Sequence, residues 1–290
     1  MRRRLVLPIL ACLLLVASAC ELKNMVPQGD APLRYRDEVF TSVTKTSDVI
    51  YGSAVNAQGQ LQQLALDVYE PVGDTVTSRP AIVWVHGGSF SGGSKTSPEI
   101  VDEANTFARK GYLNVSINYR LRSGCSLANP APCVPAILDA KYDAQAAVRF
   151  LRANATAYGI DISRIAIAGT SAGAITALNV GYSPDDPGTS GNPGYSSAVK
   201  AAVSLSGARL LTAANPGEAA ALLFHGTNDG AVPYAWAEDT VEEADAAGLV
   251  AEITTWEGAG HVPYGQHRTQ ILDQTRNFLY FSMQLQNAAH

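Results

Sequence analysis

The sequence has few charged residues, and its basic residues form no cluster beyond the first four positions. Charged residues make up 16% of the 290 positions, and the formal net charge is −5. A protein that binds duplex nucleic acid needs a clustered face of lysine and arginine, so this composition excludes that class. The 25 glycines and 15 prolines are scattered without a period. Their scatter excludes collagen-like and repetitive architectures.

Loops that bind phosphate and clusters that bind metal are also lacking. The glycine-rich segment 169–173 is followed neither by a Lys-Ser/Thr pair nor by an acidic residue that ends a second strand, so it fits no nucleotide or dinucleotide loop. Cys125 and Cys133 have no histidine beside them, which argues against zinc. We therefore expect no cofactor and no metal.

What the sequence has in quantity is apolar side chains. Hydrophobic residues make up 47% of the chain, which is enough for one sizeable core. A chain of this length fits one large α/β domain or two small domains.

The N-terminus has the three parts of a secretory signal. Arginines at 2–4 precede an apolar run at 5–16, and the small residues Ala-Ser-Ala follow at 17–19. The run is too short to span a membrane comfortably, so we expect residues 1–19 to be a cleaved signal peptide, with a retained anchor as the alternative. Cleavage leaves 18 basic and 26 acidic residues, a formal charge of −8.

The cysteine that follows this cleavage site, Cys20, resembles the lipid-bearing first residue of bacterial lipoproteins, although Ala17 stands where such signals usually carry leucine. Loss of Cys12 with the signal leaves an odd number of cysteines. Lipidation of Cys20 would leave Cys125 and Cys133 to close a proline-rich loop as a disulfide in an oxidising compartment. We expect a lipoprotein tethered in the bacterial cell envelope, with simple secretion as the alternative.

Residues 20–35 are polar and read as an N-terminal tether, and residues 36–290 form the expected catalytic domain. Within that domain, strand patterns alternate with helix patterns. Strands are expected at 64–69, 81–85, 113–118, 164–168, 201–205, 221–224 and 251–256, and helices at 99–110, 135–158, 172–180, 236–247 and 266–286. This order predicts an α/β fold with a mostly parallel sheet and helices on both faces. The Gly/Pro-rich segment 183–194 reads as a surface loop that lines the entrance of a site.

Ser171 is the candidate nucleophile. It is the central residue of Gly-Thr-Ser-Ala-Gly at 169–173, which fits G-x-S-x-G. The motif follows an expected strand and opens an expected helix, so the serine lies on a tight turn that exposes its hydroxyl. The pentapeptide alone is a weak indication of a nucleophile, because glycine, serine and alanine are common; its position between a strand and a helix makes the indication stronger.

A second glycine-rich segment, His-Gly-Gly-Ser-Phe-Ser-Gly-Gly at 86–93, follows the expected strand 81–85. Attack by a serine on a carbonyl group gives a tetrahedral intermediate, whose oxyanion needs two or more converging N–H donors. We expect the amides of Gly87, Gly88 and Ala172 to form this oxyanion hole. His86 reads as a structural residue of the loop rather than as the base.

A serine hydroxyl needs an imidazole to take its proton. Among the histidines, His261 follows the strand 251–256 in a glycine-rich turn and is the favoured base. His267 is the alternative candidate for the base. His225 ends an apolar strand and reads as a buried residue, and His290 is the last residue of the chain.

Asp229 is the favoured carboxylate, because it lies in His-Gly-Thr-Asn-Asp at 225–229, directly after the strand that precedes the His261 strand. The order Ser, Asp, His along the chain is one in which such triads occur when the serine lies on a strand-to-helix turn. The rival acids are Glu238, Asp239, Asp245 and Glu257.

Several segments together resemble the signature of the α/β-hydrolase superfamily, specifically its bacterial esterase/lipase (carboxylesterase-like) group. These segments lie, in order, at 86–88, 92–93, 118–121, 169–173 and 225–229. The resemblance covers nearly the whole mature chain. It implies the α/β-hydrolase fold, with Ser171 as nucleophile, Asp229 as acid, His261 as base and the amides of Gly87, Gly88 and Ala172 as the oxyanion hole.

The chain departs from the group at Ala174, where many relatives carry glycine, and at Ser89, where lipase-like members often carry a third glycine. These departures leave the subfamily open. No long insertion that could form a cap lies between Ser171 and Asp229, which suggests an open site for short acyl chains or bulky, polymer-borne esters.

We therefore expect a serine esterase that acts on acetyl-, feruloyl- or other short-chain acyl esters, borne on a small molecule or a polymer. One alternative is an exopeptidase, because prolyl-oligopeptidase relatives share the His-Gly-Thr-x-Asp segment, although those enzymes generally add a gating domain. Another is a non-catalytic binding protein with a hydrolase fold. We expect no nucleic-acid partner and no membrane contact except through the lipid; the oligomeric state stays open.

Overall fold

The computed structural model describes residues 21–126, 133–184 and 186–288. The predicted signal peptide, Cys20 and His290 lie outside these ranges. The strands are β1 (Val43–Val55), β2 (Leu61–Pro71), β3 (Arg79–Val85), β4 (Leu113–Ile117), β5 (Ile160–Thr170), β6 (Ala201–Leu205), β7 (Ala220–Gly226) and β8 (Ala251–Trp256). The helices are η1 (Leu22–Asn24), α1 (Pro98–Arg109), α2 (Val134–Ala153), α3 (Ala155–Tyr158), α4 (Ala172–Gly181), α5 (Tyr234–Ala246), α6 (Tyr264–Ser282) and η3 (Leu285–Asn287).

The eight strands form one sheet in the order β1-β2-β4-β3-β5-β6-β7-β8. From β4 to β8 all neighbours are parallel, whereas β1 and β2 pair antiparallel. The parallel strands β3 and β5 are apolar runs such as Ala81–Val85, because helices cover both faces of this part of the sheet. The expected fold class, an α/β-hydrolase fold with a mostly parallel central sheet and helices on both faces, is confirmed.

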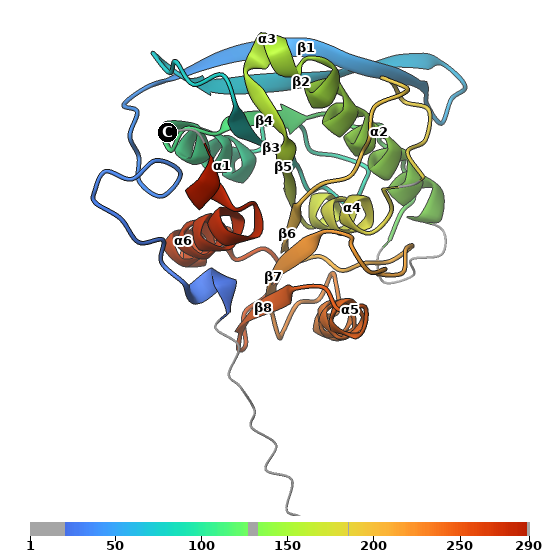
Figure 1. Ribbon diagram of the computed structural model, residues 1–290. Helices are drawn as coiled ribbons and strands as arrows, with labels where there is room; N and C mark the ends of the chain where they lie inside the picture. Colours follow the sequence, from blue (N-terminus) through green and yellow to red (C-terminus); the bar gives the residue numbers. More distant parts are fainter. Residues whose placement is uncertain (1–20, 127–132, 185, 289–290) are drawn as a thin grey trace, which may run out of the picture.

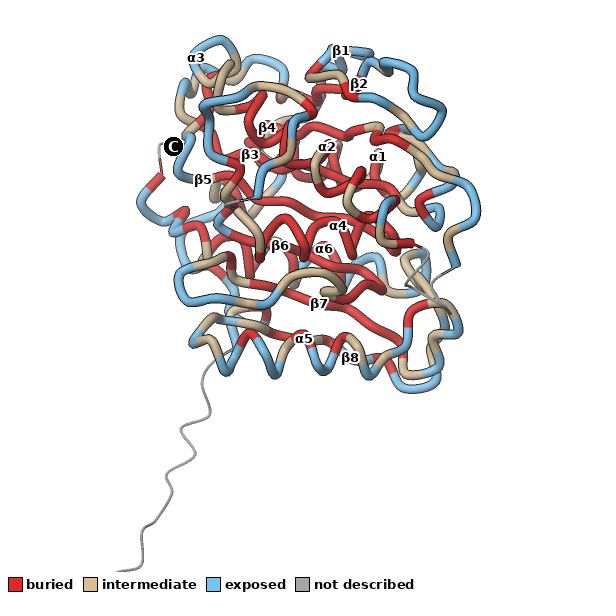
Figure 2. The backbone as a smooth tube through the Cα atoms, turned by 90° about the vertical axis from the view of Figure 1, so that its right-hand side faces the viewer, coloured by how far each residue is buried: buried red, intermediate tan, exposed pale blue. Residues whose placement is uncertain are grey.

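Helices lie on both faces of the sheet (Figure 1). One core lies under α2, α4 and α5, and includes Ile137, Ile175 and Ala237. The other lies under α1 and α6, and includes Phe107 and Phe278. Figure 2 shows the result: the central strands are buried along their length, and exposed residues gather in the connecting turns. The carboxyl ends of the parallel strands meet at one edge of this sheet.

The sequence analysis missed β1. Most of its side chains are exposed, and its ladder with β2 has two register shifts, so no sustained alternation of apolar and polar residues is visible. Strand β1 is held in place by its pairing with β2: it lies at the edge of the sheet and forms ladder hydrogen bonds with β2 from Val43 to Val55.

The loop at 183–194 does not line the site entrance, so that expectation was wrong. Its described residues lie along α2: the Arg149 guanidinium donates to the carbonyl of Gly191 (2.7 Å), and Asn192 donates to the carbonyl of Tyr51 in β1 (2.7 Å). Hydrogen bonds to a helix flank and an edge strand hold this loop away from the pocket around Ser171.

The described part of the expected tether, residues 21–35, packs against the domain. The buried Lys23 ammonium donates to the carbonyl of Ile253 at 2.8 Å, and the Glu252 carboxylate accepts from the backbone amides of Leu22 and Lys23. The tether was predicted from polar composition; in the structure, polar groups of this segment form hydrogen bonds with residues 252–253 at the start of β8.

Cys125 and Cys133 form a disulfide, in agreement with the expected pairing. The bond joins the segment after β4 to the start of α2. Among the described residues, no helix is both long and apolar enough to cross a membrane.

Candidate active site

Ser171 lies on a sharp turn between β5 and α4. Its φ angle of 53° is in the left-handed region, which is strained for a residue other than glycine. The flanking glycines allow the turn: a Cβ at Gly173 would lie 2.0 Å from the carbonyl oxygen of Val85, and one at Gly169 would lie 2.4 Å from that of Gly173. The Ser171 amide donates to Leu205 in β6 at 2.8 Å, which fixes the turn against the sheet.

The structure brings Ser171, His261 and Asp229 together in one chain of hydrogen bonds. His261 Nε2 lies 2.8 Å from Ser171 Oγ, and His261 Nδ1 lies 2.8 Å from Asp229 Oδ2. The carboxylate can only accept, so Nδ1 carries the proton and Nε2 is free to accept the serine proton. The three residues follow β5, β7 and β8, at the carboxyl edge of the sheet.

The side chain of Asp229 is buried and surrounded by donors. The His225 Nε2 atom lies 3.2 Å from Asp229 Oδ2, and the amides of Ala231 and Val232 donate to Oδ1 at 2.8 and 3.0 Å. Burial works against ionisation of Asp229, but the hydrogen bonds from His225, His261 and these amides outweigh it and hold its pKa well below the ordinary value. The carboxylate therefore stays ionised beside the imidazole.

The loop that carries His261 is held by Ser206, which the sequence analysis missed. The Ser206 hydroxyl accepts from the amide of Val262 at 3.0 Å, and both residues have positive φ angles, 59° and 50°. Ser206 directly follows β6 and carries no local motif, so only the fold reveals this contact.

The glycine-rich loop after β3 forms the opposite wall. The His86 carbonyl accepts from the Tyr119 hydroxyl at 3.1 Å, and the His86 ring stacks on that of Tyr119. His86 is thus buried and structural, as expected. Gly88 has a φ of +116°, and a Cβ there would lie 2.3 Å from the carbonyl oxygen of Gly92.

The amides of Gly87, Gly88 and Ala172 have no acceptor in the described part of the chain. A Cβ on Gly87 would lie 3.2 Å from the Cβ of Ser171, so this loop passes directly beside the serine. The amide of Ser89, a residue with a φ of 51° on the same wall, is likewise without an acceptor in the described ranges and adds a donor that the sequence analysis did not include.

The rival residues lie elsewhere. Glu257 is exposed, as are three acids on α5, Glu238, Asp239 and Asp245. The ring of His267 stacks on Trp256 at 4.1 Å between ring centroids. His225 is fully buried behind Asp229, as its apolar strand suggested.

Ser171 and His261 open into a pocket of about 350 Å³. Its walls are the glycine-rich loop (87–89 and 93), residues 97 and 99 at the start of α1, and residues 170–171 and 261–262. Within the described ranges, no group of three or more His, Cys, Asp or Glu side chains could hold a metal ion.

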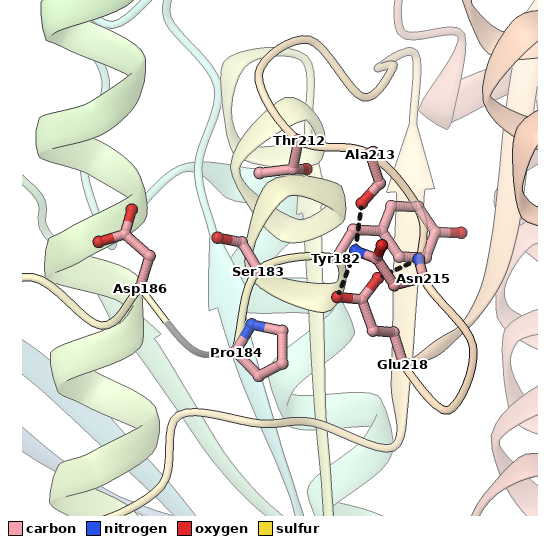
Figure 3. A pocket seen from close by; sticks show the side chains of 8 residues that line it. All are labelled: Tyr182, Ser183, Pro184, Asp186, Thr212, Ala213, Asn215 and Glu218. Atoms are coloured by element: carbon pink, nitrogen blue, oxygen red, sulfur yellow. Dashed lines mark hydrogen bonds between the residues drawn. The ribbon is translucent and has the colours of Figure 1, made fainter.

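A second depression, of about 330 Å³, lies beside the end of α4 (Figure 3). Its acids are engaged within the protein: Glu218 accepts from the Asn215 amide at 2.7 Å, and Asp186 accepts from Lys141 at 2.7 Å. It contains Ser183, and none of the described residues that line it is a histidine. This depression therefore lacks the groups that hydrolysis needs.

Comparison with known proteins supports this fold. The profile of the BD-FAE family matches residues 66–218, more than half of the chain, and the profile of TAP-like proteins matches residues 208–281. The fumonisin B1 esterase of Sphingopyxis macrogoltabida is 34% identical over 116 residues, which cover 38% of this chain and 21% of that protein. The phenmedipham hydrolase of Pseudarthrobacter oxydans is 35% identical over 111 residues, which cover 37% of this chain and 21% of that protein.

This chain thus matches only about a fifth of the length of these curated relatives. A solved structure, Thermogutta terrifontis esterase 2 phosphoramylated by tabun, matches with a TM-score of 0.68 and 24% identity, over 86% of this chain and 97% of that chain. That likeness supports the fold. The chain belongs to the BD-FAE family of α/β-hydrolase esterases.

Proposed function

We propose that this protein is a carboxylic ester hydrolase that forms an acyl-enzyme on Ser171. The observation that carries the proposal is the hydrogen-bond chain from Ser171 Oγ through His261 to Asp229, with both bonds at 2.8 Å. The esterase and hydrolase names of the relatives support the same activity.

In the first half of the reaction, Ser171 Oγ attacks the ester carbonyl carbon while His261 Nε2 takes the hydroxyl proton. The carbonyl oxygen becomes an oxyanion, which the amides of Gly87, Gly88 and Ala172 stabilise, with the Ser89 amide as a further donor on this wall. Asp229 holds the imidazole in the required tautomer and stabilises its positive charge. Collapse of the intermediate breaks the ester C–O bond, and His261 returns the proton to the leaving alcohol.

In the second half, His261 takes a proton from water, and the resulting hydroxide attacks the acyl-enzyme carbonyl. A second oxyanion forms in the same hole, the bond to Ser171 Oγ breaks, and the serine regains its proton from His261. The products are a carboxylic acid and the free enzyme. The pocket has no cap over it in the described chain, which suits short acyl or acetyl- and feruloyl-type esters on small molecules or polymers.

The test is turnover of p-nitrophenyl acetate by the wild type, by Ser171→Ala and by Ser42→Ala, a matched change at an exposed serine before β1. We expect Ser171→Ala to lower kcat by about 10⁴-fold or more and Ser42→Ala to leave it unchanged. Full activity of Ser171→Ala would refute the proposal. Faster turnover of aminoacyl p-nitroanilides than of esters would instead indicate a peptidase.

We further propose that Cys20 carries the lipid that tethers the enzyme in the cell envelope. This proposal rests on the position of Cys20 directly after the signal-like segment. Metabolic labelling with a palmitate analogue should mark the wild type and not Cys20→Ser, whereas an unlabelled wild type in the culture medium would indicate secretion.

A further inference from the structure

The pocket around Ser171 contains one acidic side chain. Glu99, in the first turn of α1, lies on its wall with Ser97, and among the described residues no lysine or arginine contributes to that wall. Of the described side chains on the wall, His261 is the one other that can titrate. The charge that a substrate meets beside the serine is therefore negative.

The side chain of Glu99 has no hydrogen bond or ion pair with any described residue. The Ser97 side chain, at the N-cap of α1, makes no capping bond either. By contrast, Asp102 on the same helix is engaged, since it accepts from Tyr264 at 2.6 Å and from Arg268 at 2.8 Å. Arg268, a cation on the neighbouring α6, is thus paired with Asp102 and does not neutralise Glu99.

Glu103, one turn after Glu99, supplies no positive charge that could neutralise Glu99. Its side chain is buried, at 6% exposure, and no described residue forms a hydrogen bond or ion pair with its carboxyl group. A carboxylate in the first turn of a helix also interacts favourably with the helix dipole. That interaction does not require the carboxylate to line a pocket or to lack a partner. Glu99 thus lines the pocket, its carboxylate has no partner among the described residues, and no described cation neutralises it. These features are those of a subsite for a positively charged group.

We infer that Glu99 makes this pocket prefer esters that carry a cationic group, such as an ammonium or quaternary ammonium, over neutral esters of the same shape. The inference rests on the proposed function, because it concerns the substrate of the same site. The cation would lie against the carboxylate while the ester carbonyl lies at Ser171 Oγ.

Because Glu99 is only partly buried, water weakens its attraction for a cation. We expect a preference of about fivefold in kcat/KM, which corresponds to about 1 kcal/mol at 1.4 kcal/mol per tenfold. The preference should shrink as salt is added, since the Debye length falls from about 10 Å at 0.1 M to about 3 Å at 1 M.

The test compares acetylthiocholine with its neutral isostere 3,3-dimethylbutyl thioacetate, and follows the released thiol. We expect the kcat/KM ratio of cationic to neutral ester to exceed one in the wild type, to fall about fivefold in Glu99→Gln and to stay unchanged in Glu238→Gln, a matched change on the exposed face of α5. The glutamine keeps the shape and removes the charge, and it exchanges one acceptor oxygen for an NH2 donor.

An equal ratio in the wild type and in Glu99→Gln would overturn the inference while leaving the esterase proposal intact, because both esters would still be cleaved at Ser171. A wild type that cleaves neither thioester nor p-nitrophenyl acetate would instead overturn the proposed function, and the inference with it.

Discussion

At the scale of single residues, the site depends on how Asp229 is kept charged. Its carboxylate lies between His261 and His225, and two backbone amides complete its donors. Because His225 Nε2 lies near two acceptors, Asp229 and the carbonyl of Val232, that nitrogen carries the proton. His225 therefore supports the carboxylate from behind and leaves the imidazole of His261 free for proton transfer.

The change Asp229→Asn should lower kcat for p-nitrophenyl acetate by about 10³–10⁴-fold with little change in KM, because an amide that donates to Nδ1 imposes the wrong tautomer on His261. Since the pKa of Asp229 is lowered, its protonation should not limit wild-type activity at pH values above about 4. The control is Asp239→Asn on α5. Wild-type kinetics in Asp229→Asn would remove this residue from the mechanism.

Glu103 should make stability depend on pH. Burial, helped by the charges of Glu99 and Asp102, raises the pKa of Glu103 well above its model-compound value of 4.5. For a carboxyl with a raised pKa, stability is fully present below the unfolded pKa and is lost as pH rises through the folded pKa. Urea denaturation should therefore find Glu103→Gln more stable relative to wild type at pH 8 than at pH 4, and an advantage that is the same at both values would contradict this.

At the scale of elements, α4 approaches β3 so closely at Gly173 that no side chain fits between them. The change Gly173→Ala should cost about 2–3 kcal/mol or more of folding free energy, because its Cβ would lie 2.0 Å from the carbonyl oxygen of Val85. It should also remove most activity, since relief of the clash moves Ser171. Denaturation and p-nitrophenyl acetate assays measure both effects.

Gly265→Ala in α6 is the matched control, because a Cβ there meets nothing within 4 Å. It should leave stability unchanged or slightly raised. Equal effects of the two substitutions would show that Gly173 is not a site of close approach.

Elements with a strong local signal were predictable from the sequence. Strands β6 and β8 coincide with the expected ranges 201–205 and 251–256, because short apolar runs there are bounded by polar turns. Strand β1 was not predictable by the same reasoning, since exposed side chains and bulges hide its period and its order comes from pairing with β2. The same holds for 183–194, whose place along α2 is fixed by hydrogen bonds between distant residues.

The residues of the candidate site were likewise predictable only where a local sequence motif marks them. Ser171, Asp229 and His261 each lie in a glycine-containing motif at the end of an expected strand, so the sequence pointed to all three. Ser206 and Glu99 have no such motif. Their relation to the site arises only when β6 and α1 are brought beside the loops that carry His261 and Ser171.

At the scale of the whole molecule, the docked N-terminal segment and the candidate site lie at opposite ends of β8. Lys23 and Leu22 bind residues 252–253, at the start of that strand, whereas His261 follows its end. Docking of this segment can therefore affect the stability of the fold without reaching the site.

Accordingly, Lys23→Ala should lower the free energy of unfolding by about 1–2 kcal/mol, because it leaves the carbonyl of Ile253 without its donor. The value of kcat/KM at 25 °C should not change. The exposed Lys200 provides the matched control, Lys200→Ala. A large loss of activity with unchanged stability would show that this segment contributes to the site.

The most direct test of the whole scheme is covalent labelling of the intact protein with diethyl p-nitrophenyl phosphate, followed by peptide mass mapping. A serine activated by His261 should displace one p-nitrophenolate per chain, gain one diethylphosphoryl group on the peptide that contains Ser171, and lose esterase activity in proportion. His261→Gln should slow this labelling strongly. A phosphoryl group on a different residue, or esterase activity that persists when Ser171 is fully labelled, would contradict the account.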